Sequence, residues 1–237
     1  MDKIVKDVLG HILDENQKIK FPAWCKKVSI DVGTSINAPN SEYWLNLDNE
    51  LCVFAFEPNP FNVKHLFTGE KIWPIHLNPQ KINHSFFIVE CALSNGDPRY
   101  SEFYCTSGDS GTSSMFKPSH FDVRELIKVP TISFKNFFDL FDWEKINYIE
   151  HLKIDAQSSD FDIVRGAGKY LSEKVLYLTV ETNTGNQYLN QESPQEMKEY
   201  IESQGFYCEH WNQNGRFLNK NFKHLWSTVE YKFLEPD

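Results

Sequence analysis

The sequence lacks the cysteine spacings of zinc ribbons and of disulfide-rich domains. It holds five cysteines, an odd number, and no two of them form a CxxC pair. This pattern argues against a disulfide framework and is typical of proteins in a reducing compartment, so we expect a cytoplasmic protein. The positions are Cys25, Cys52, Cys91, Cys105 and Cys208.

Long apolar runs and basic patches are also missing. No stretch is apolar enough to span a membrane, and the charged first 20 residues carry no cleavage signature of a signal peptide. The net charge is −9, and the longest basic run is Lys26-Lys27. Because an acidic surface repels phosphate groups, the sequence predicts neither nucleic acid nor a membrane as a partner. It is compatible with a small-molecule ligand, particularly a cationic one.

Glycine is scarce where a dinucleotide-binding protein needs it. The stretch VSIDVGTSINAPN, residues 28–40, has only Gly33 where the GxGxxG motif would supply three glycines. Three glycines let the backbone approach a pyrophosphate closely, and Asp31 would repel that group. The stretch therefore argues against a nucleotide-dependent oxidoreductase, which stays the least favoured alternative.

What the sequence does contain is an alternation of apolar strand patterns and helical patterns over 237 residues. This length suits one large domain, and the alternation predicts a mostly parallel sheet with helices on both faces. The last two strands have no helix between them, so they predict an antiparallel edge. The expected strands are 27–33, 51–60, 85–94, 101–106, 129–134, 148–156, 174–182, 206–212 and 224–233.

Several helices have recognisable starts. Residues 2–19 have helical apolar spacing and predict an amphipathic helix that packs on the body, with a lid or a homodimer contact as the alternatives. Asn59 and Pro60 suit a helix start, and Ser158 or Ser159 would cap a helix over 158–171. Ser193 and Glu196 predict a capping box for the last helix.

Carboxylates follow four of the expected strands: Asp31, Glu57, Asp155 and Glu181. Ligands bind parallel sheets outside the carboxyl ends of the strands, so we expect these side chains to gather at one edge. Glu57 lies 26 positions after Asp31, which places it to accept hydrogen bonds from both hydroxyls of a ribose. These residues predict a cofactor that contains a nucleoside.

The single-glycine turn and Asp31 favour a cofactor with a positive centre. S-adenosylmethionine carries a sulfonium, an ammonium and an adenosine, so a carboxylate beside the turn would attract it rather than repel it. We expect Asp31 to serve the cationic end of this cofactor, directly or through water.

Four segments in order resemble the FkbM-type family of S-adenosylmethionine-dependent methyltransferases: SIDVGTSINAP, FAFEPNP, ALSNGDPRYSEFY and HLKIDAQSSDFDIVRGAGKYL. The resemblance covers roughly residues 28–182 and is most specific in the last segment. There the family pattern L-K-I-D-x-[EQ]-G-x-E-x-x-x-L-x-G-A is matched from Leu152 to Asp155 and at Gln157, Gly166 and Ala167. The sequence departs from the family at several positions: Asn37 replaces a second glycine in the first turn, where it can adopt a left-handed backbone, Ser158 replaces the glycine after Gln157, and Asp160 replaces the glutamate of the last segment.

The resemblance implies a Rossmann-like, seven-stranded methyltransferase domain over residues 28–237, preceded by a helical extension over 1–27. It implies methylation of a hydroxyl on a sugar or a small natural-product-like acceptor. The alternative is an inactive protein of the same fold that binds the cofactor or a partner without turnover.

Candidate site residues follow from the strand ends, the loops and the resemblance. Asp155 is the first candidate for the base that deprotonates the acceptor, Glu181 could orient the acceptor or act as base, and His120 lies in a Ser/Gly-rich loop that could close over it. No residue is assigned to a metal. The predicted cofactor site consists of Asp31, Gly33, Thr34, Asn37, Glu57, Pro58, Cys91, Ala92, Leu93 and Asp155.

Overall fold

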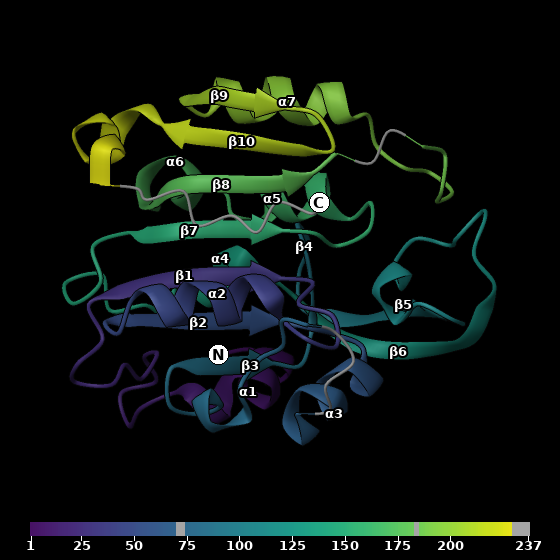
Figure 1. Ribbon diagram of the computed structural model, residues 1–237, viewed down its shortest axis with the longest axis horizontal. Coiled ribbons are helices and arrows are strands. Elements are labelled where there is room, and N and C mark those ends of the chain that lie inside the picture. Colours follow the sequence, from purple (N-terminus) through teal and green to yellow (C-terminus); the bar gives the residue numbers. More distant parts are fainter. Residues whose placement is uncertain (70–73, 183–184, 229–237) are drawn as a thin grey trace.

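The computed structural model describes residues 1–69, 74–182 and 185–228, and it is built around a seven-stranded sheet. The strand order is β3-β2-β1-β7-β8-β10-β9, and only β10 runs antiparallel to its neighbours (Figure 1). This order confirms the predicted mostly parallel sheet with an antiparallel edge. The strands are β1 (Lys27–Val32), β2 (Leu51–Phe56), β3 (Phe86–Val89), β7 (Ile149–Ile154), β8 (Val175–Glu181), β9 (Phe206–Trp211) and β10 (Asn214–Asn219).

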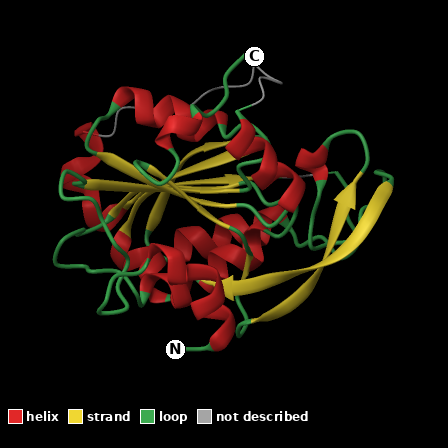
Figure 2. Cartoon of the chain, turned by 90° about the horizontal axis from the view of Figure 1, so that it is seen from below, coloured by secondary structure: helices red, strands yellow, loops and turns green. Residues whose placement is uncertain are grey.

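Helices cover both faces of this sheet, as Figure 2 shows from below. The α-helices are α1 (Lys3–Leu9), α2 (Pro39–Leu47), α3 (Pro60–Thr68), α4 (Phe134–Phe138), α5 (Asp160–Gly166), α6 (Lys169–Lys174) and α7 (Pro194–Ser203). Short 3₁₀ helices are η1 (Gly10–Ile12), η2 (Pro79–Lys81), η3 (Ser110–Thr112) and η4 (Lys220–Thr228). In the described part of the chain, every helix is too short or too polar to cross a lipid bilayer.

The alternation of side chains along β2 explains the two cores. Leu51, Val53 and Ala55 face one side and pack with residues of α2 and α3. Cys52, Phe54 and Phe56 face the other side and belong to the larger core, which also includes residues of α1, α4, α5 and α7. Because successive strand residues point to opposite faces, one fully apolar strand serves both layers.

The expected strand over 85–94 is two strands. β3 ends at Val89 in the large sheet, and β4 (Ala92–Ser94) pairs with β6 (Val123–Ser133) in a second sheet of order β4-β6-β5. β5 (Arg99–Thr106) pairs with β6 as an antiparallel hairpin that extends from the body of the molecule (Figure 2). The apolar residues on both sides of Glu90 do not reveal that the chain changes sheets there, which is why the sequence predicted one strand.

Three other expectations were wrong in detail. The N-terminal helix ends at Leu9, with one 3₁₀ turn to Ile12, instead of reaching residue 19. The partner of β9 is β10 rather than 224–233: residues 224–228 lie in η4, and 229–233 fall outside the described residues. The helix over 158–171 is split into α5 and α6 at Gly168, which has a positive φ of 54°.

Helix starts were predicted well where proline or serine defined them. The Asn59 side chain accepts a hydrogen bond from the backbone of Phe61, and Pro60 is the first residue of α3. Ser193 accepts from the backbone of Glu196 at the start of α7, which is one of the two hydrogen bonds of the predicted capping box. At α5, in contrast, neither Ser158 nor Ser159 caps with its side chain; the Asp160 carboxylate accepts from the backbone of Ala156 instead.

Gly166 holds α5 against β4, and this contact leaves no room for a side chain. A Cβ at this position would lie 2.2 Å from the carbonyl oxygen of Ser94. We expect Gly166→Ala to lower the free energy of unfolding by about 2 kcal/mol or more, because the backbone must move apart. Chemical denaturation measures the change.

Gly10→Ala is the matched control, because no atom lies within 4 Å of its Cβ position and its φ is −55°. This variant should gain up to about 0.5 kcal/mol from the higher helix propensity of alanine. Equal stability of the two variants would contradict the packing argument.

Candidate active site

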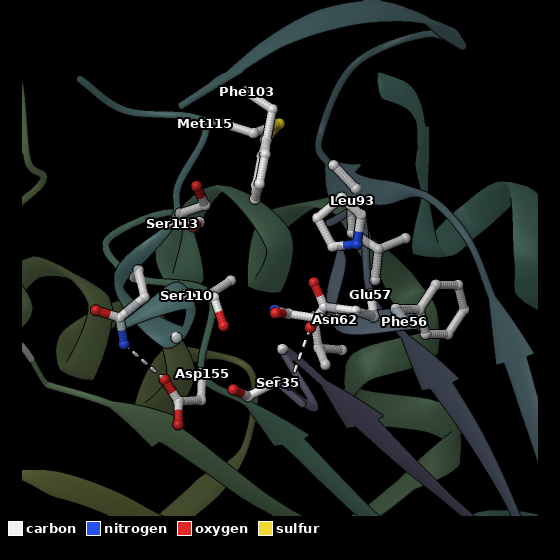
Figure 3. Close-up of a pocket in the computed structure, with 18 of the residues that line it drawn as sticks. Ser35, Phe56, Glu57, Asn62, Leu93, Phe103, Ser110, Ser113, Met115 and Asp155 are labelled. Carbon is white, nitrogen blue, oxygen red and sulfur yellow. Dashed lines mark hydrogen bonds between the residues drawn. The ribbon is translucent and has the colours of Figure 1, made fainter. Parts of the chain in front are cut away.

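A cavity of about 340 Å³ lies where β1, β2 and β7 end, at the point where the strand order of the large sheet reverses. Its other walls come from β4, β5 and the segment 107–122, which we call the cap (Figure 3). Eight of the predicted cofactor residues line it: Gly33, Asn37, Glu57, Pro58, Cys91, Ala92, Leu93 and Asp155.

Glu57 is fixed in the cavity wall by two backbone hydrogen bonds. Its Oε2 accepts from the N–H of Ser35 at 2.9 Å, and its Oε1 accepts from the N–H of Asn59 at 2.9 Å. Burial raises the pKa of Glu57 to about 7, and the two N–H groups and the Asn62 side chain oppose that shift. The side chain is 3% exposed, so a ligand with hydroxyl donors would supply hydrogen bonds that water cannot.

The turn after β1 depends on Gly33. Its φ is +73°, and a Cβ there would lie 1.8 Å from the carbonyl oxygen of Asp155. Asn37 does not adopt the left-handed backbone that we expected of it; Ser35 (φ 57°) and Ala38 (φ 42°) do. The Asn37 side chain donates to the carbonyl of Ile75 instead, at 3.1 Å.

Asp31 lies behind the cavity rather than in its wall. It is 1% exposed, accepts a hydrogen bond from Ser41 Oγ at 2.6 Å, and lies 3.3 Å from the ammonium of Lys153. Thr34 is buried as well and does not line the cavity. Asp31 therefore does not contact a ligand in the cavity directly. Its carboxylate acts on the site through its ion pair with Lys153.

Lys153 joins two of the strand-end carboxylates. Its Nζ lies 3.3 Å from Asp31 and 3.4 Å from Asp155. Burial works against its charge, but Asp31 and Asp155 outweigh that effect and hold the pKa of Lys153 above the usual lysine value. Lys153 is therefore protonated, and its ammonium group orients the Asp155 carboxyl.

The side of the cavity away from Asp155 is apolar. Phe56 and Leu93 come from the expected strands, and Phe103 and Met115 come from β5 and the cap (Figure 3). These side chains form a surface suited to a planar, weakly polar ring. The sequence indicated the region around Cys91, Ala92 and Leu93 but gave no signal for Phe103 or Met115, which the hairpin brings in from outside the large sheet.

The cap is tied to the rest of the site by side-chain hydrogen bonds. Ser114 Oγ donates to the carbonyl of Gln157 at 2.7 Å, and Asn59 Nδ2 donates to Ser113 Oγ at 3.4 Å. The Tyr188 hydroxyl lies within 2.8 Å of the carbonyl of Thr112 and 2.9 Å of Gln157 Oε1. The Ser/Gly-rich loop that the sequence predicted could close over the acceptor is therefore a wall of the cavity.

Gln157 connects the two candidate catalytic carboxylates. Its Nε2 donates to Asp155 Oδ1 at 3.0 Å and to Glu181 Oε2 at 3.1 Å. Gln157 and Ser158 both have positive φ, 51° and 75°. Two consecutive left-handed residues are a strained arrangement that is seen mostly at functional sites. Ser158 thus adopts the backbone conformation that the family's glycine would adopt easily.

Two carboxyls with raised pKa values lie beyond Gln157: Asp160, which is buried, and Glu181, which is half-buried. Burial, Asp155 and Asp160 raise the pKa of Glu181 to about 9, and burial and Asp155 raise the pKa of Asp160 to about 7. Glu181 therefore keeps its proton at neutral pH. Its side chain does not line the cavity.

His120 does not line the cavity either, because its side chain is exposed. Within the described ranges, no three His, Cys, Asp or Glu side chains are grouped so that they could hold a metal ion.

The strand order, the switch-point cavity and the acidic residue at the end of β2 define a Rossmann-like methyltransferase fold. A family model described as the methyltransferase FkbM domain matches residues 31–208, well over half of the chain. The chain therefore belongs to the FkbM methyltransferase family, as its motifs predicted, and is a methyltransferase. Neither the curated proteins nor the solved structures contain a match.

The raised pKa of Glu181 predicts how stability depends on pH. The folded state holds this proton up to about pH 9, whereas the unfolded chain releases it near 4.5, so stability falls as pH rises between these values. We expect Glu181→Gln to remove this loss, raising the melting temperature at pH 8 by a few degrees (~2–4 °C) relative to wild type. At pH 4 the two proteins should differ little.

The exposed Glu15 offers a matched control, since Glu15→Gln changes the same charge on the surface. Melting curves of the three proteins at pH 4, 6 and 8 provide the measurement. A Glu181→Gln variant that parallels wild type at every pH would contradict the burial of a neutral Glu181.

Proposed function

We propose that this protein is an S-adenosylmethionine-dependent methyltransferase that acts on a hydroxyl of a sugar or a small natural-product-like acceptor. The observation that carries the cofactor assignment is the Glu57 carboxylate, held in the cavity wall by two backbone N–H groups. The family is usually dependent on this cofactor. The hydroxyl preference rests on the resemblance to FkbM-type enzymes.

The two halves of the cavity fit the two halves of a nucleoside. Glu57 and Asn62 offer acceptors for ribose hydroxyls or an exocyclic amine: Asn62 is 2% exposed, and its Oδ1 has no hydrogen-bond partner among the described residues. Leu93, Phe103 and Met115 offer an apolar surface for the base. A carboxylate that accepts hydrogen bonds from two hydroxyls, next to an apolar surface for a ring, selects for nucleosides. A ligand that leaves a buried acceptor without a hydrogen bond binds more weakly.

The charge of the cavity suits a cationic cofactor. Glu57, Asp109 and Asp155 line it, and no Lys, Arg or His among the described residues does. S-adenosylmethionine, when bound, supplies an electrophilic methyl group on a sulfonium, which an acceptor oxygen attacks as the carbon–sulfur bond breaks. Carboxylates near that position favour a positive ligand over a phosphorylated one.

Asp155 is the residue best placed to receive the proton of the acceptor hydroxyl. It lines the cavity, and Lys153 and Gln157 fix its two oxygens by contacts to Oδ2 and Oδ1. Glu181 is less suited to this role because it already carries a proton at neutral pH. A positioned base typically contributes about 10²–10⁴-fold to the rate of such a reaction.

The cofactor assignment predicts that Glu57→Gln weakens the binding of S-adenosylhomocysteine. The variant keeps the size of the side chain but loses the charge that strengthens hydrogen bonds from ribose. We expect the dissociation constant to rise about 10–100-fold, since hydrogen bonds to charged groups contribute about 1.5–3 kcal/mol. Isothermal titration calorimetry measures the constant.

Glu102→Gln serves as the control, because Glu102 is an exposed glutamate on β5 outside the cavity. It should bind S-adenosylhomocysteine as wild type does. Unchanged affinity in Glu57→Gln would remove the ribose assignment, and binding of NAD in place of S-adenosylhomocysteine would favour the oxidoreductase alternative.

The acceptor assignment predicts a methoxy product. Incubating the protein with S-adenosylmethionine labelled with ¹³C on the methyl group, together with a panel of sugars and small alcohols, should give a ¹³C resonance typical of an O-methyl ether. Asp155→Asn should lower the rate by about 10²-fold or more, because the hydroxyl loses its base. A label on nitrogen or carbon would contradict the hydroxyl assignment, and cofactor binding without turnover would favour the inactive alternative.

A further inference from the structure

The buried Tyr188, in the connection between β8 and α7, lies outside the cavity but contacts two of the residues that line it. Its side chain is 2% exposed. Its hydroxyl lies 2.8 Å from the carbonyl oxygen of Thr112, which belongs to the cap, and 2.9 Å from Oε1 of Gln157, the neighbour of Asp155. Tyr188 therefore stands where the cap meets the candidate base.

The backbone holds Tyr188 in this place independently of the side chain that its hydroxyl contacts. Backbone hydrogen bonds join the residues on either side of it to the cap. The N–H of Ser119 donates to the carbonyl of Gln187 at 2.7 Å, and the N–H of Leu189 donates to the carbonyl of Lys117 at 2.9 Å. A hydroxyl anchored in this way can restrain a flexible side chain that reaches it.

The Tyr188 hydroxyl is a donor with a single proton. Burial, together with nearby carboxyls of which Glu181 has the largest effect, raises the pKa of Tyr188 above the usual tyrosine value, so the group stays protonated at neutral pH. Both of its neighbours are carbonyl oxygens, which only accept hydrogen bonds. The cap and the Gln157 amide therefore share one donor.

The Gln157 amide uses all its polar groups in one orientation. Its Oε1 faces the Tyr188 hydroxyl, and the two protons of Nε2 are donated to Asp155 at 3.0 Å and to Glu181 at 3.1 Å. A turned amide would place its carbonyl oxygen against the Asp155 carboxyl, with no proton between them. The left-handed backbone of Gln157 is strained, so the side-chain contacts have to hold the residue in place.

We propose that Tyr188 is a positioning residue for the base: its hydroxyl holds the Gln157 amide with the NH₂ group toward Asp155, from a place that the cap fixes. The inference rests on the proposed function where it takes Asp155 as the base, whereas the restraint on Gln157 is a property of the free protein. Residues of the cap line the cavity, so a ligand that packs against the cap also sets the orientation of the base.

The restraint on Gln157 can be measured in the free, full-length protein by NMR. In protein labelled with ¹⁵N in its glutamine side chains, Tyr188→Phe should make the NH₂ protons of Gln157 exchange with water about 5–10-fold faster, because the amide loses one hydrogen bond. The Gln157 signal is assigned by its absence from Gln157→Met. The variant keeps the ring that packs on Phe121, with 5.9 Å between the ring centroids, so we expect it to fold. An exchange rate equal to that of wild type would overturn the proposal.

Two further variants show whether the effect belongs to this hydroxyl. Tyr207→Phe removes the hydroxyl of an exposed tyrosine on β9 and should leave the exchange rate of Gln157 unchanged. Ser114→Ala removes a hydrogen bond from the cap to the backbone of Gln157 but none to its amide, so it should weaken the binding of S-adenosylhomocysteine without speeding exchange. If Ser114→Ala speeds exchange as much as Tyr188→Phe does, the tyrosine only fastens the cap, and the positioning role is overturned.

Rate measurements test the effect on the base. With an acceptor found in the methyl-labelling experiment, Tyr188→Phe should lower kcat about 10-fold and leave the KM for S-adenosylmethionine near the wild-type value. The double variant Tyr188→Phe/Gln157→Met should be no slower than Gln157→Met alone, because the tyrosine acts only through the amide. Additive losses in the double variant, or a higher KM with an unchanged kcat, would contradict the positioning role.

The inference and the proposed function fail in different experiments. If wild type binds S-adenosylhomocysteine and Tyr188→Phe exchanges as wild type does, the inference is overturned and the proposed function stands. If wild type does not bind S-adenosylhomocysteine, the proposed function fails, and the exchange experiment still decides whether Tyr188 holds Gln157.

Discussion

The arrangement of the site depends on one buried ammonium among four carboxyls. Lys153 stands on β7 between Asp31 and Asp155, and its positive charge offsets the cost of placing these two carboxyls in buried and half-buried positions. It is too far along the network to neutralise Asp160 and Glu181 fully, so burial leaves those two with raised pKa values. On the side of the cavity, the Asp155 carboxyl is oriented by Lys153. On the far side, Asp160 and Glu181 have raised pKa values and so favour their protonated forms.

Most of the fold could be predicted from the sequence because local signals agreed with the tertiary structure. The buried strands β1, β2, β7 and β8 are short apolar runs bounded by turn residues, and no competing element fits them. Errors arose where one pattern is compatible with two structures. Residues 85–94 have a strand pattern on both sides of Glu90 yet belong to two sheets, and residues 224–228 lie in a 3₁₀ helix rather than a strand.

The site was predictable only as far as the strand ends define it. Glu57 and Asp155 come directly from the carboxyl ends of parallel strands, whose positions the fold dictates. Asp31 has the same sequence context, but its side chain points to Lys153, and strand alternation alone does not tell which partner it meets. Phe103, Met115 and Tyr188 reach the site from the hairpin, the cap and the β8–α7 connection, so their roles depend on contacts between segments that are distant in sequence.

β6 is a single strand with two very different halves. Its first part, near Val123, is exposed on both faces, and its last part, near Ile132, is buried against β4. The hairpin is therefore held at both ends: β6 pairs with β4 near Ile132, and the cap that joins the outer ends of β5 and β6 is bonded to Gln157 and Asn59. Phe103 lies between these two attachments and lines the cavity. A macromolecule or a cross-link that displaced the exposed face of the hairpin would therefore also displace the wall of the nucleoside pocket.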